Sequence, residues 1–189
     1  TNPFNVLVTS NQITGHRIGI HAVNVDGIEV TNNGDNTALG IHMFNHDANF
    51  SPNEFYRGIW LQNCPHAFVA ENVISNIVEV TSSTNAFRGI DIEESVRARI
   101  NCNEVSGVPF GMYFLNYCNG TLLRANEFSL YKNAINLENA SLPDQVQWND
   151  QAQEMEPLDN LWNDAPVGGA NPQTDRVTGT ASPFNWYFR

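Results

Sequence analysis

The chain has 189 residues, a formal net charge of −11 and a sequence pI near 4.6, and only 15% of its residues are charged. This length suits one domain, and an acidic chain without a basic stripe argues against binding to nucleic acid or to anionic membranes. No apolar run is long enough to span a bilayer, so we expect no membrane insertion.

Two kinds of short strand alternate along the chain. One kind follows a Gly-Ile pair or a variant of it, at residues 19–23, 40–44, 58–62, 89–93, 111–115 and 134–138. The other kind precedes an asparagine, at residues 7–9, 28–30, 68–70, 96–100 and 122–124. Apolar and polar residues alternate in both, which places them on opposite faces of a strand. No window carries a convincing helical period.

The asparagines that follow the second kind of strand recur in phase with the Gly-Ile pairs. They are Asn11, Asn32, Asn53, Asn72, Asn103 and Asn126, spaced 21, 21, 19, 31 and 23 residues apart. A period in this range indicates a stacked repeat, because two or three short strands cannot enclose a core alone. The pattern therefore predicts a parallel β-helix, in which strands of successive coils pair and bury one apolar column.

The repeated asparagines have a predicted structural role. Asparagine tolerates a left-handed backbone at a tight turn, and its side-chain amide bonds nearby backbone groups. Stacked amides can also donate and accept along the column, so we expect a ladder of the six asparagines. A shorter second ladder is expected at Asn63, Asn116 and Asn139, each five residues past a Gly-Ile mark.

Two adjacent segments carry a resemblance to a known superfamily. Residues 58–64 read Gly-Ile-Trp-Leu-Gln-Asn-Cys, and residues 68–74 read Phe-Val-Ala-Glu-Asn-Val-Ile. They resemble the repeat of right-handed parallel β-helix proteins of the pectin-lyase-like group, and are most similar to secreted bacterial surface modules. The resemblance covers roughly residues 5–150 and implies about six right-handed coils and a secreted or cell-surface location. Because that superfamily holds lyases, hydrolases, tailspikes and adhesins, it specifies no single activity.

The sequence repeat divides the chain into a repetitive part and a part without the repeat. Residues 1–150 are predicted to be the β-helix domain, and residues 151–189, rich in proline and aromatics, an irregular C-terminal tail or a linker to a further domain. Residues 76–85 are predicted to leave the column as an insertion. The repeat has already begun at Leu7, and no polar capping segment precedes it. Because β-helices need capped ends, we expect the chain to be a piece of a larger parent protein.

The three cysteines fit the repeat without a disulfide. Cys64 and Cys118 each precede a marker asparagine by eight residues, with Ser95 in the equivalent slot between them. Two coils of about 4.8 Å each separate the pair, which is too far for a disulfide. Small buried thiols are therefore expected at both positions.

The polar positions of the Gly-Ile strands are predicted to form an outward row. Its members are His21, His42, Trp60, Asp91, Tyr113 and Asn136, with Arg57 and Arg88 at its flank. Aromatic rings stack on the apolar faces of sugars, while amides, carboxylates and arginines bond hydroxyls. We therefore expect the row residues His21, His42, Trp60 and Tyr113, together with Arg57 and Arg88, to bind a polysaccharide or cell-surface glycan.

Asp91 and Glu93 are the candidate catalytic residues. They lie two residues apart on one strand face, about 6.5–7 Å between Cα atoms, a spacing compatible with glycoside hydrolysis. His42 is a candidate base nearby. The resemblance to lyases implies calcium-binding aspartates and a catalytic Lys or Arg. Here the single lysine, Lys132, lies outside the row, and no aspartate cluster repeats across coils.

Metal sites are not expected. A pair of stacked imidazoles at His21 and His42 could bind a transition metal, and Asp91, Glu93 and Glu94 could bind calcium, but no ligand motif supports either. No cofactor is therefore expected. The favoured function is a non-catalytic secreted or surface β-helix module with a structural or adhesive role. The alternatives are a fragment of a polysaccharide lyase or glycoside hydrolase, and a purely structural spacer of a filament or long adhesin.

Overall fold

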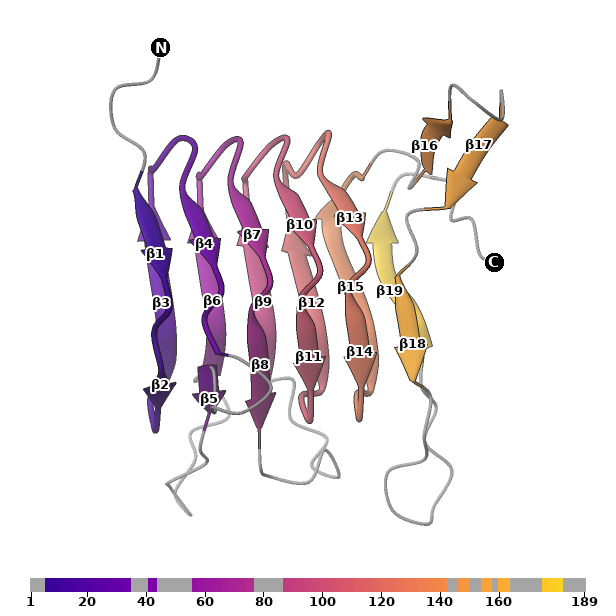
Figure 1. Ribbon diagram of the computed structural model, residues 1–189. Helices are drawn as coiled ribbons and strands as arrows, with labels where there is room; N and C mark the ends of the chain where they lie inside the picture. The colour runs from indigo at the N-terminus through magenta and orange to yellow at the C-terminus, as the bar shows by residue number, and fades with distance from the viewer. Residues whose placement is uncertain are drawn as a thin grey trace.

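The computed structural model describes residues 6–34, 41–43, 56–76, 87–142, 146–149, 154–157, 160–163 and 175–181. Within these ranges the chain forms strands that stack in parallel along one axis, coil beside coil (Figure 1). The same ranges contain no helix long and apolar enough to cross a membrane. The predicted fold class, an all-β parallel β-helix, is confirmed.

Three parallel sheets wrap the column. Sheet A consists of β1 (Leu7–Thr9), β4 (Glu29–Thr31), β7 (Phe68–Ala70), β10 (Arg99–Asn101) and β13 (Leu122–Arg124). Sheet B consists of β2 (Ile13–Thr14), β5 (Ile41–Met43), β8 (Val73–Asn76), β11 (Glu104–Ser106), β14 (Glu127–Ser129) and β18 (Leu161–Asn163). Sheet C consists of β3 (Ile18–Val23), β6 (Tyr56–Gln62), β9 (Phe87–Glu93), β12 (Phe110–Leu115), β15 (Asn133–Ala140) and β19 (Asp175–Ala181).

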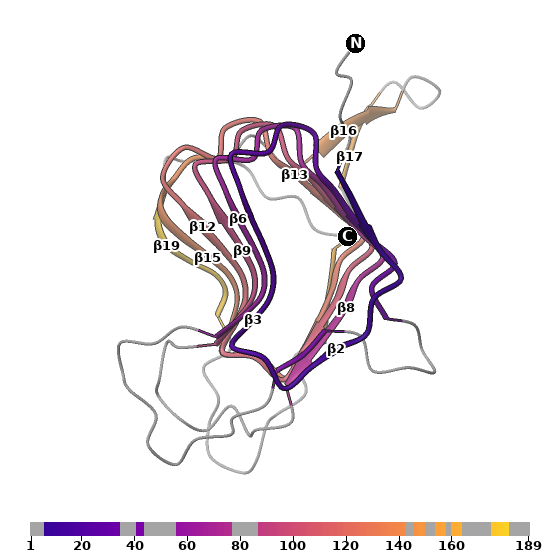
Figure 2. The same cartoon turned by 90° about the vertical axis from the view of Figure 1, so that its left-hand side faces the viewer.

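Each of the first five coils contributes one strand to each sheet in the order A, B, C. The first coil is β1 to β3, the next three follow the same order, the fifth is β13 to β15, and the sixth adds β18 and β19. In Figure 2 the strands of one sheet lie one behind another around a common interior. About six coils were predicted, and sheets B and C each have six strands.

The interior is an unbroken apolar column. Along sheet C the inward positions include Ile59, Leu61, Ile90, Ile92, Met112 and Phe114, none of which exposes any surface. Sheets A and B add Val69, Ile100 and Leu123, and Ile74, Val105 and Phe128. Each such side chain contributes roughly 1.5–3 kcal/mol when it leaves water. The alternation in the sequence thus predicted the inward face correctly.

The asparagine ladder exists, but one of its members differs from the prediction. The side chains that bond from coil to coil belong to Asn11, Asn33, Asn72, Asn103, Asn126 and Asn160. In each pair, both the backbone N–H and the Nδ2 of one asparagine donate to the Oδ1 of the next, as from Asn72 to Asn103 at 3.2 and 2.9 Å. Asn32 is not a member, and Asn53 lies outside the described residues.

The left-handed turn falls on the residue before each of the first five ladder asparagines. Ser10, Asn32, Glu71, Cys102 and Ala125 have φ between 51° and 57°. The positive φ turns the chain so that the following side chain enters the column, and the asparagine there is selected for its amide. The prediction that the ladder asparagines are themselves left-handed is therefore wrong. The three residues predicted to form a second ladder do have this conformation, Asn63, Asn116 and Asn139 (φ 48°, 60° and 51°). Asn63 Nδ2 donates to Asn24 Oδ1 and Asn116 Nδ2 donates to Glu94 Oε1.

The second coil is longer than the sequence period indicated. The segment after Gly40 was predicted to lie in the outward row, but Ile41 pairs with Ile13 and Ile74, so β5 belongs to sheet B. His42 accordingly pairs with Thr14 and Ser75, away from sheet C. The expected stacking of His42 on His21 is wrong. Since Ile41 is buried in the column either way, its hydrophobic pattern could not distinguish the two sheets.

Two strands beyond residue 151 continue the column where an irregular tail was expected. β18 pairs with β14 in sheet B, and β19 pairs with β15 in sheet C. Asn160, just before β18, accepts both N–H groups of Asn126 through its Oδ1. A separate antiparallel pair, β16 (Val146–Asn149) with β17 (Glu154–Pro157), lies between the fifth and sixth coils in the chain.

The glycines of sheet C mark a close approach of backbones. A Cβ on Gly89 would lie 2.5 Å from the carbonyl oxygen of Gly111 and 2.5 Å from Cγ1 of Val105. Gly19, Gly58 and Gly111 are confined in the same way by the next coil and by a sheet B side chain. The recurring glycine therefore makes room where sheet C turns away from sheet B.

The cysteines occupy the positions that the repeat predicted. Cys64, Ser95 and Cys118 are fully buried at equivalent turns, and the backbone N–H of Cys64 donates to Ser95 Oγ at 2.8 Å. Burial raises the pKa of the Cys118 thiol to about 11, and burial also raises that of Cys64. Cys102 lies at an exposed turn.

We expect one fast-reacting thiol in the native protein and three after unfolding in urea. At pH 8, a thiol with a pKa of about 11 is ionised in about one molecule in a thousand, and the thiolate is the reactive form. The raised pKa therefore suppresses labelling of Cys118 below about pH 10. Labelling with a chromogenic disulfide, with mass spectrometry to locate the adduct, checks that Cys102 alone reacts. Fast native labelling of Cys64 or Cys118 would contradict the buried turn positions.

Candidate functional site

Five members of the predicted outward row do lie side by side on sheet C. In register across β3, β6, β9, β12 and β15 they are His21, Trp60, Asp91, Tyr113 and Asn136. Exposure varies along the row: His21 is exposed, Trp60 and Asn136 are half-buried, and Asp91 and Tyr113 are buried. The row is therefore not a uniformly solvated surface.

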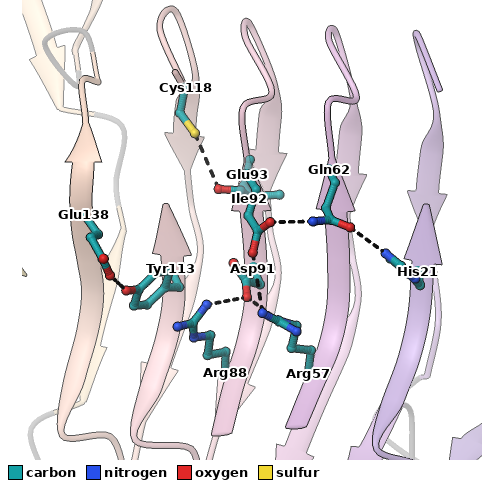
Figure 3. Close-up of polar contacts among 10 residues, drawn as sticks. All are labelled: His21, Arg57, Gln62, Arg88, Asp91, Ile92, Glu93, Tyr113, Cys118 and Glu138. Atoms are coloured by element: carbon teal, nitrogen blue, oxygen red, sulfur yellow. Dashed lines mark hydrogen bonds and ion pairs between the residues drawn. The ribbon is translucent and has the colours of Figure 1, made fainter. Parts of the chain in front are cut away.

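Asp91 is the electrostatic centre of this row. It exposes no surface, and its Oδ2 accepts hydrogen bonds from Arg57 Nε and, at 2.7 Å, from Arg88 Nη1 (Figure 3). Both arginines are more than nine-tenths buried. The two guanidinium groups provide the compensation that a buried carboxylate requires.

A chain of polar side chains extends from this centre toward the first coil. Arg57 Nη2 donates to Glu93 Oε1 at 3.5 Å, and Gln62 Nε2 donates to Glu93 Oε2 at 2.6 Å. Gln62 Oε1 in turn lies 3.0 Å from His21 Nε2. Toward the fifth coil, the hydroxyl of Tyr113 donates to Glu138 Oε2. Figure 3 shows the contacts from His21 to Arg88 as one connected run across β3, β6 and β9, and the Tyr113–Glu138 contact as a separate pair between β12 and β15.

The aromatic rings in the row stack on neighbouring side chains. The His21 and Trp60 rings are parallel within 5°, with centroids 4.0 Å apart, and Arg57 Cζ lies 3.8 Å from the Trp60 centroid. Two groups this close cannot share one face of a ring, so His21 and Arg57 cover opposite faces. Arg88 Cζ likewise lies 3.5 Å from the Tyr113 ring. Ring faces that a sugar would need are thus occupied within the protein.

The candidate acid pair lies on one strand face, as predicted, but its members differ in access. Glu93 is half-buried, whereas Asp91 exposes no surface, and a general acid or base must come within hydrogen-bond reach of its substrate. Asp91 Oδ1 and Trp60 Nε1 are buried and have no partner among the described residues. A water could satisfy both groups. The catalytic roles of Asp91 and Glu93 stay predictions.

A second site, which the sequence analysis did not identify, lies on the outer face of sheet A. It is an open cleft of about 600 Å³, lined by Glu29, His66, Phe68, Arg97, Arg99, Gly120 and Leu122. We refer to these residues as the sheet A cleft. They come from four successive coils, so the cleft runs along the column for about 14 Å, three inter-coil steps of 4.8 Å. The alternating stretch Val96-Arg-Ala-Arg-Ile100 was the signal that could have indicated it.

The outward row of sheet A that lines the cleft alternates charged and apolar side chains from coil to coil. Phe68 and Leu122 are half-buried outward positions of β7 and β13. Arg99 is exposed between Phe68 and Leu122, in register with both, and Arg97 is exposed in the turn before β10. Glu29 lies on β4, on the other side of Phe68. His66 Nδ1 lies 2.9 Å from Asp26 Oδ1, an exposed contact that contributes little to stability. Apolar side chains next to charged groups in one cleft give a ligand both packing and hydrogen-bonding partners.

Metal-ligating groups do not cluster in the described part of the chain. No set of three or more His, Cys, Asp and Glu side chains lies close enough there to hold an ion. The His66–Asp26 contact offers two donors, and Cys64 and Cys118 are separated by the coil that carries Ser95. Transition-metal sites in proteins draw on imidazole, thiolate and thioether ligands. The described residues do not provide such a set, so we derive no metal chemistry from them.

Comparison with known proteins gives one family match. Residues 5–165 match the family model described as periplasmic copper-binding protein (NosD). No curated protein matches the chain significantly, and neither does any solved structure. The matched region covers every coil from β1 to β18.

Proposed function

Because this chain belongs to the periplasmic copper-binding protein (NosD) family, whose members are periplasmic right-handed parallel β-helix proteins, we propose that it is a non-catalytic binding module of the cell envelope. Its ligand is a carbohydrate, polysaccharide or cell-surface glycan, held in the sheet A cleft. This places the binding surface on a different face from the aromatic row that the sequence indicated.

The observation that carries this proposal is the contrast between the two faces. On sheet C, Trp60 has both ring faces covered, and the carboxylate of Asp91 is held by two arginines. On sheet A, the Phe68 ring is half-buried in an open cleft. A ring of this kind can pack on the apolar C–H face of a sugar, while flanking charged groups bond its hydroxyls.

The row on sheet C then has a mechanical role. Stacked rings and paired charges from the first coil to the fifth tie neighbouring strands together on the outside, as the asparagine ladder does on the inside. Such cross-strand pairs contribute about 0.2–1 kcal/mol each. This supports a rigid scaffold that presents a ligand site.

The copper in the family's description is not assigned to a site on this chain. The family name would predict a cluster of soft or imidazole ligands, and the described residues bring together no more than the His66–Asp26 pair. Our proposal therefore rests on the cleft and not on metal.

We expect Phe68→Ala to weaken oligosaccharide binding about tenfold, since one aromatic contact is worth about 1 kcal/mol or more. Trp60→Ala serves as the aromatic control: it should lower the melting temperature and leave affinity unchanged. Isothermal titration calorimetry against a panel of neutral and acidic oligosaccharides measures affinity, and calorimetric melting measures stability. Reducing and unsaturated ends are assayed in the same samples.

Four outcomes separate the candidate functions. Loss of affinity in Phe68→Ala alone supports the sheet A cleft. Loss in Trp60→Ala alone would return the site to sheet C. Formation of new chain ends that Asp91→Asn abolishes would replace the binding module by the polysaccharide lyase or glycoside hydrolase alternative. No binding by any oligosaccharide would leave the structural spacer.

A further inference from the structure

The charge around the sheet A cleft is unusual for this chain. Although the protein carries a net charge of −11, three of its eight arginines, Arg97, Arg99 and Arg124, lie exposed on β10 and β13 or in the turn before β10. In the described structure no carboxylate lies within ion-pair distance of any of the three. Arg57 and Arg88, by contrast, are both bound to Asp91.

The cleft brings two of these cations beside apolar side chains. Arg97 and Arg99 line it beside Phe68 and Leu122, and Arg99 is in register with both Phe68 and Leu122 on the neighbouring strands. The guanidinium groups therefore belong to the coil next to the aromatic ring, about 4.8 Å along the column. A ligand that packs on Phe68 would reach them with a group attached to its ring.

Gly120 keeps space beside Arg97. Its φ is +78°, a conformation that suits glycine, and a Cβ there would lie 3.1 Å from Arg97 Cγ. The equivalent turn residues in the two preceding coils are His66 and Arg97 themselves, both with positive φ. The missing side chain at residue 120 leaves the Arg97 side of the cleft open.

We propose that the sheet A cleft selects an acidic sugar, a uronic-acid unit whose ring lies on Phe68 and whose carboxylate is bound by Arg97 and Arg99. This inference rests on the proposed function and specifies its ligand class. Planar guanidinium groups bind carboxylates through two parallel hydrogen bonds. Glu29, at the other end of the cleft, accepts from sugar hydroxyls and orients the ligand.

A carboxylate fits better than a phosphate on charge. Glu29 lines the cleft and the chain as a whole is acidic, so a second negative charge on the ligand increases repulsion without adding another cation to bind it. A singly charged carboxylate is still attracted by the two arginines, and it is repelled less by Glu29 and by the acidic chain than a doubly charged phosphate is.

The test compares three probes of equal length: a glucuronate-containing oligosaccharide, its carboxyl-reduced neutral counterpart, and a phosphorylated neutral oligosaccharide. We expect the uronate to bind about tenfold more tightly than the neutral probe, because hydrogen bonds between ionised groups are stronger than those between neutral groups. Arg99→Glu should remove that advantage and leave neutral binding intact. Lys132→Glu, the same charge change at an exposed residue that does not line the cleft, should have no effect. Raising salt should weaken uronate binding and leave binding of the neutral probe unchanged.

Each result decides the inference separately from the proposed function. Equal affinity for uronate and neutral probes, or unchanged uronate affinity in Arg99→Glu, would overturn the acidic-sugar assignment while carbohydrate binding stands. Preference for the phosphorylated probe would overturn the choice of carboxylate. Failure of all three probes to bind would reject both the assignment and the binding module.

Discussion

Replacing Asn33 by aspartate should lower the free energy of unfolding by about 3–5 kcal/mol, whereas the same change at Asn32 should cost less than about 1 kcal/mol. Asn33 exposes no surface, and its Nδ2 donates to Val8 O at 3.1 Å and to Asn72 Oδ1 at 2.7 Å. An aspartate oxygen there would face two acceptors and bring a buried charge. Asn32 is an exposed left-handed turn residue, where aspartate is tolerated.

Urea titration followed by circular dichroism measures both variants against the parent protein. The two substitutions are identical in chemistry and adjacent in the chain, so the difference between them isolates the ladder. Should Asn32→Asp prove the damaging change, the repeat would have the register that the 21-residue sequence period indicated, and the ladder described here would be wrong.

Gly89→Ala should destabilise the protein by about 3 kcal/mol or more, at the upper end of the overpacking range. The new methyl would lie 2.5 Å from a carbonyl oxygen of the next coil, which is fixed in a parallel sheet and cannot move without breaking strand pairing. A flexible side chain at this place could move away from the new methyl group, but a backbone carbonyl oxygen held between two coils cannot move away.

Ala134→Gly provides the matched control in the same column. Alanine occupies the glycine slot of the fifth coil and is buried there. We expect the reverse substitution to cost about 0.5–1 kcal/mol, the usual difference between the two residues inside a strand or helix. Urea titration measures the free energy of unfolding of both variants. A Gly89→Ala protein as stable as the parent would show that sheets B and C can separate enough at this point to hold a methyl group.

The sequence predicted most of the candidate row but not its chemistry. Alternation within a strand placed Trp60, Asp91 and Tyr113 outward, because side-chain direction is a local property of the backbone. Whether an outward side chain meets solvent or a neighbour depends on residues 20 to 40 positions away. Arg57, from the coil before, and Arg88, three residues earlier, close around Asp91, and no local pattern reports that.

By itself, the sequence determined the parallel β-helix, the inward face of each strand, the glycine column and the turn shared by Cys64, Ser95 and Cys118. All of these follow from a repeated local pattern that each coil satisfies separately. Only the tertiary structure decided that Asn33 and not Asn32 enters the ladder, that β5 joins sheet B, and that β18 and β19 form a sixth coil. It also brought Phe68, Arg97 and Arg99 into one cleft. The physical reason is that coil register is set by pairing between distant strands, and insertions within a coil change the spacing in the sequence without changing the spacing between strands.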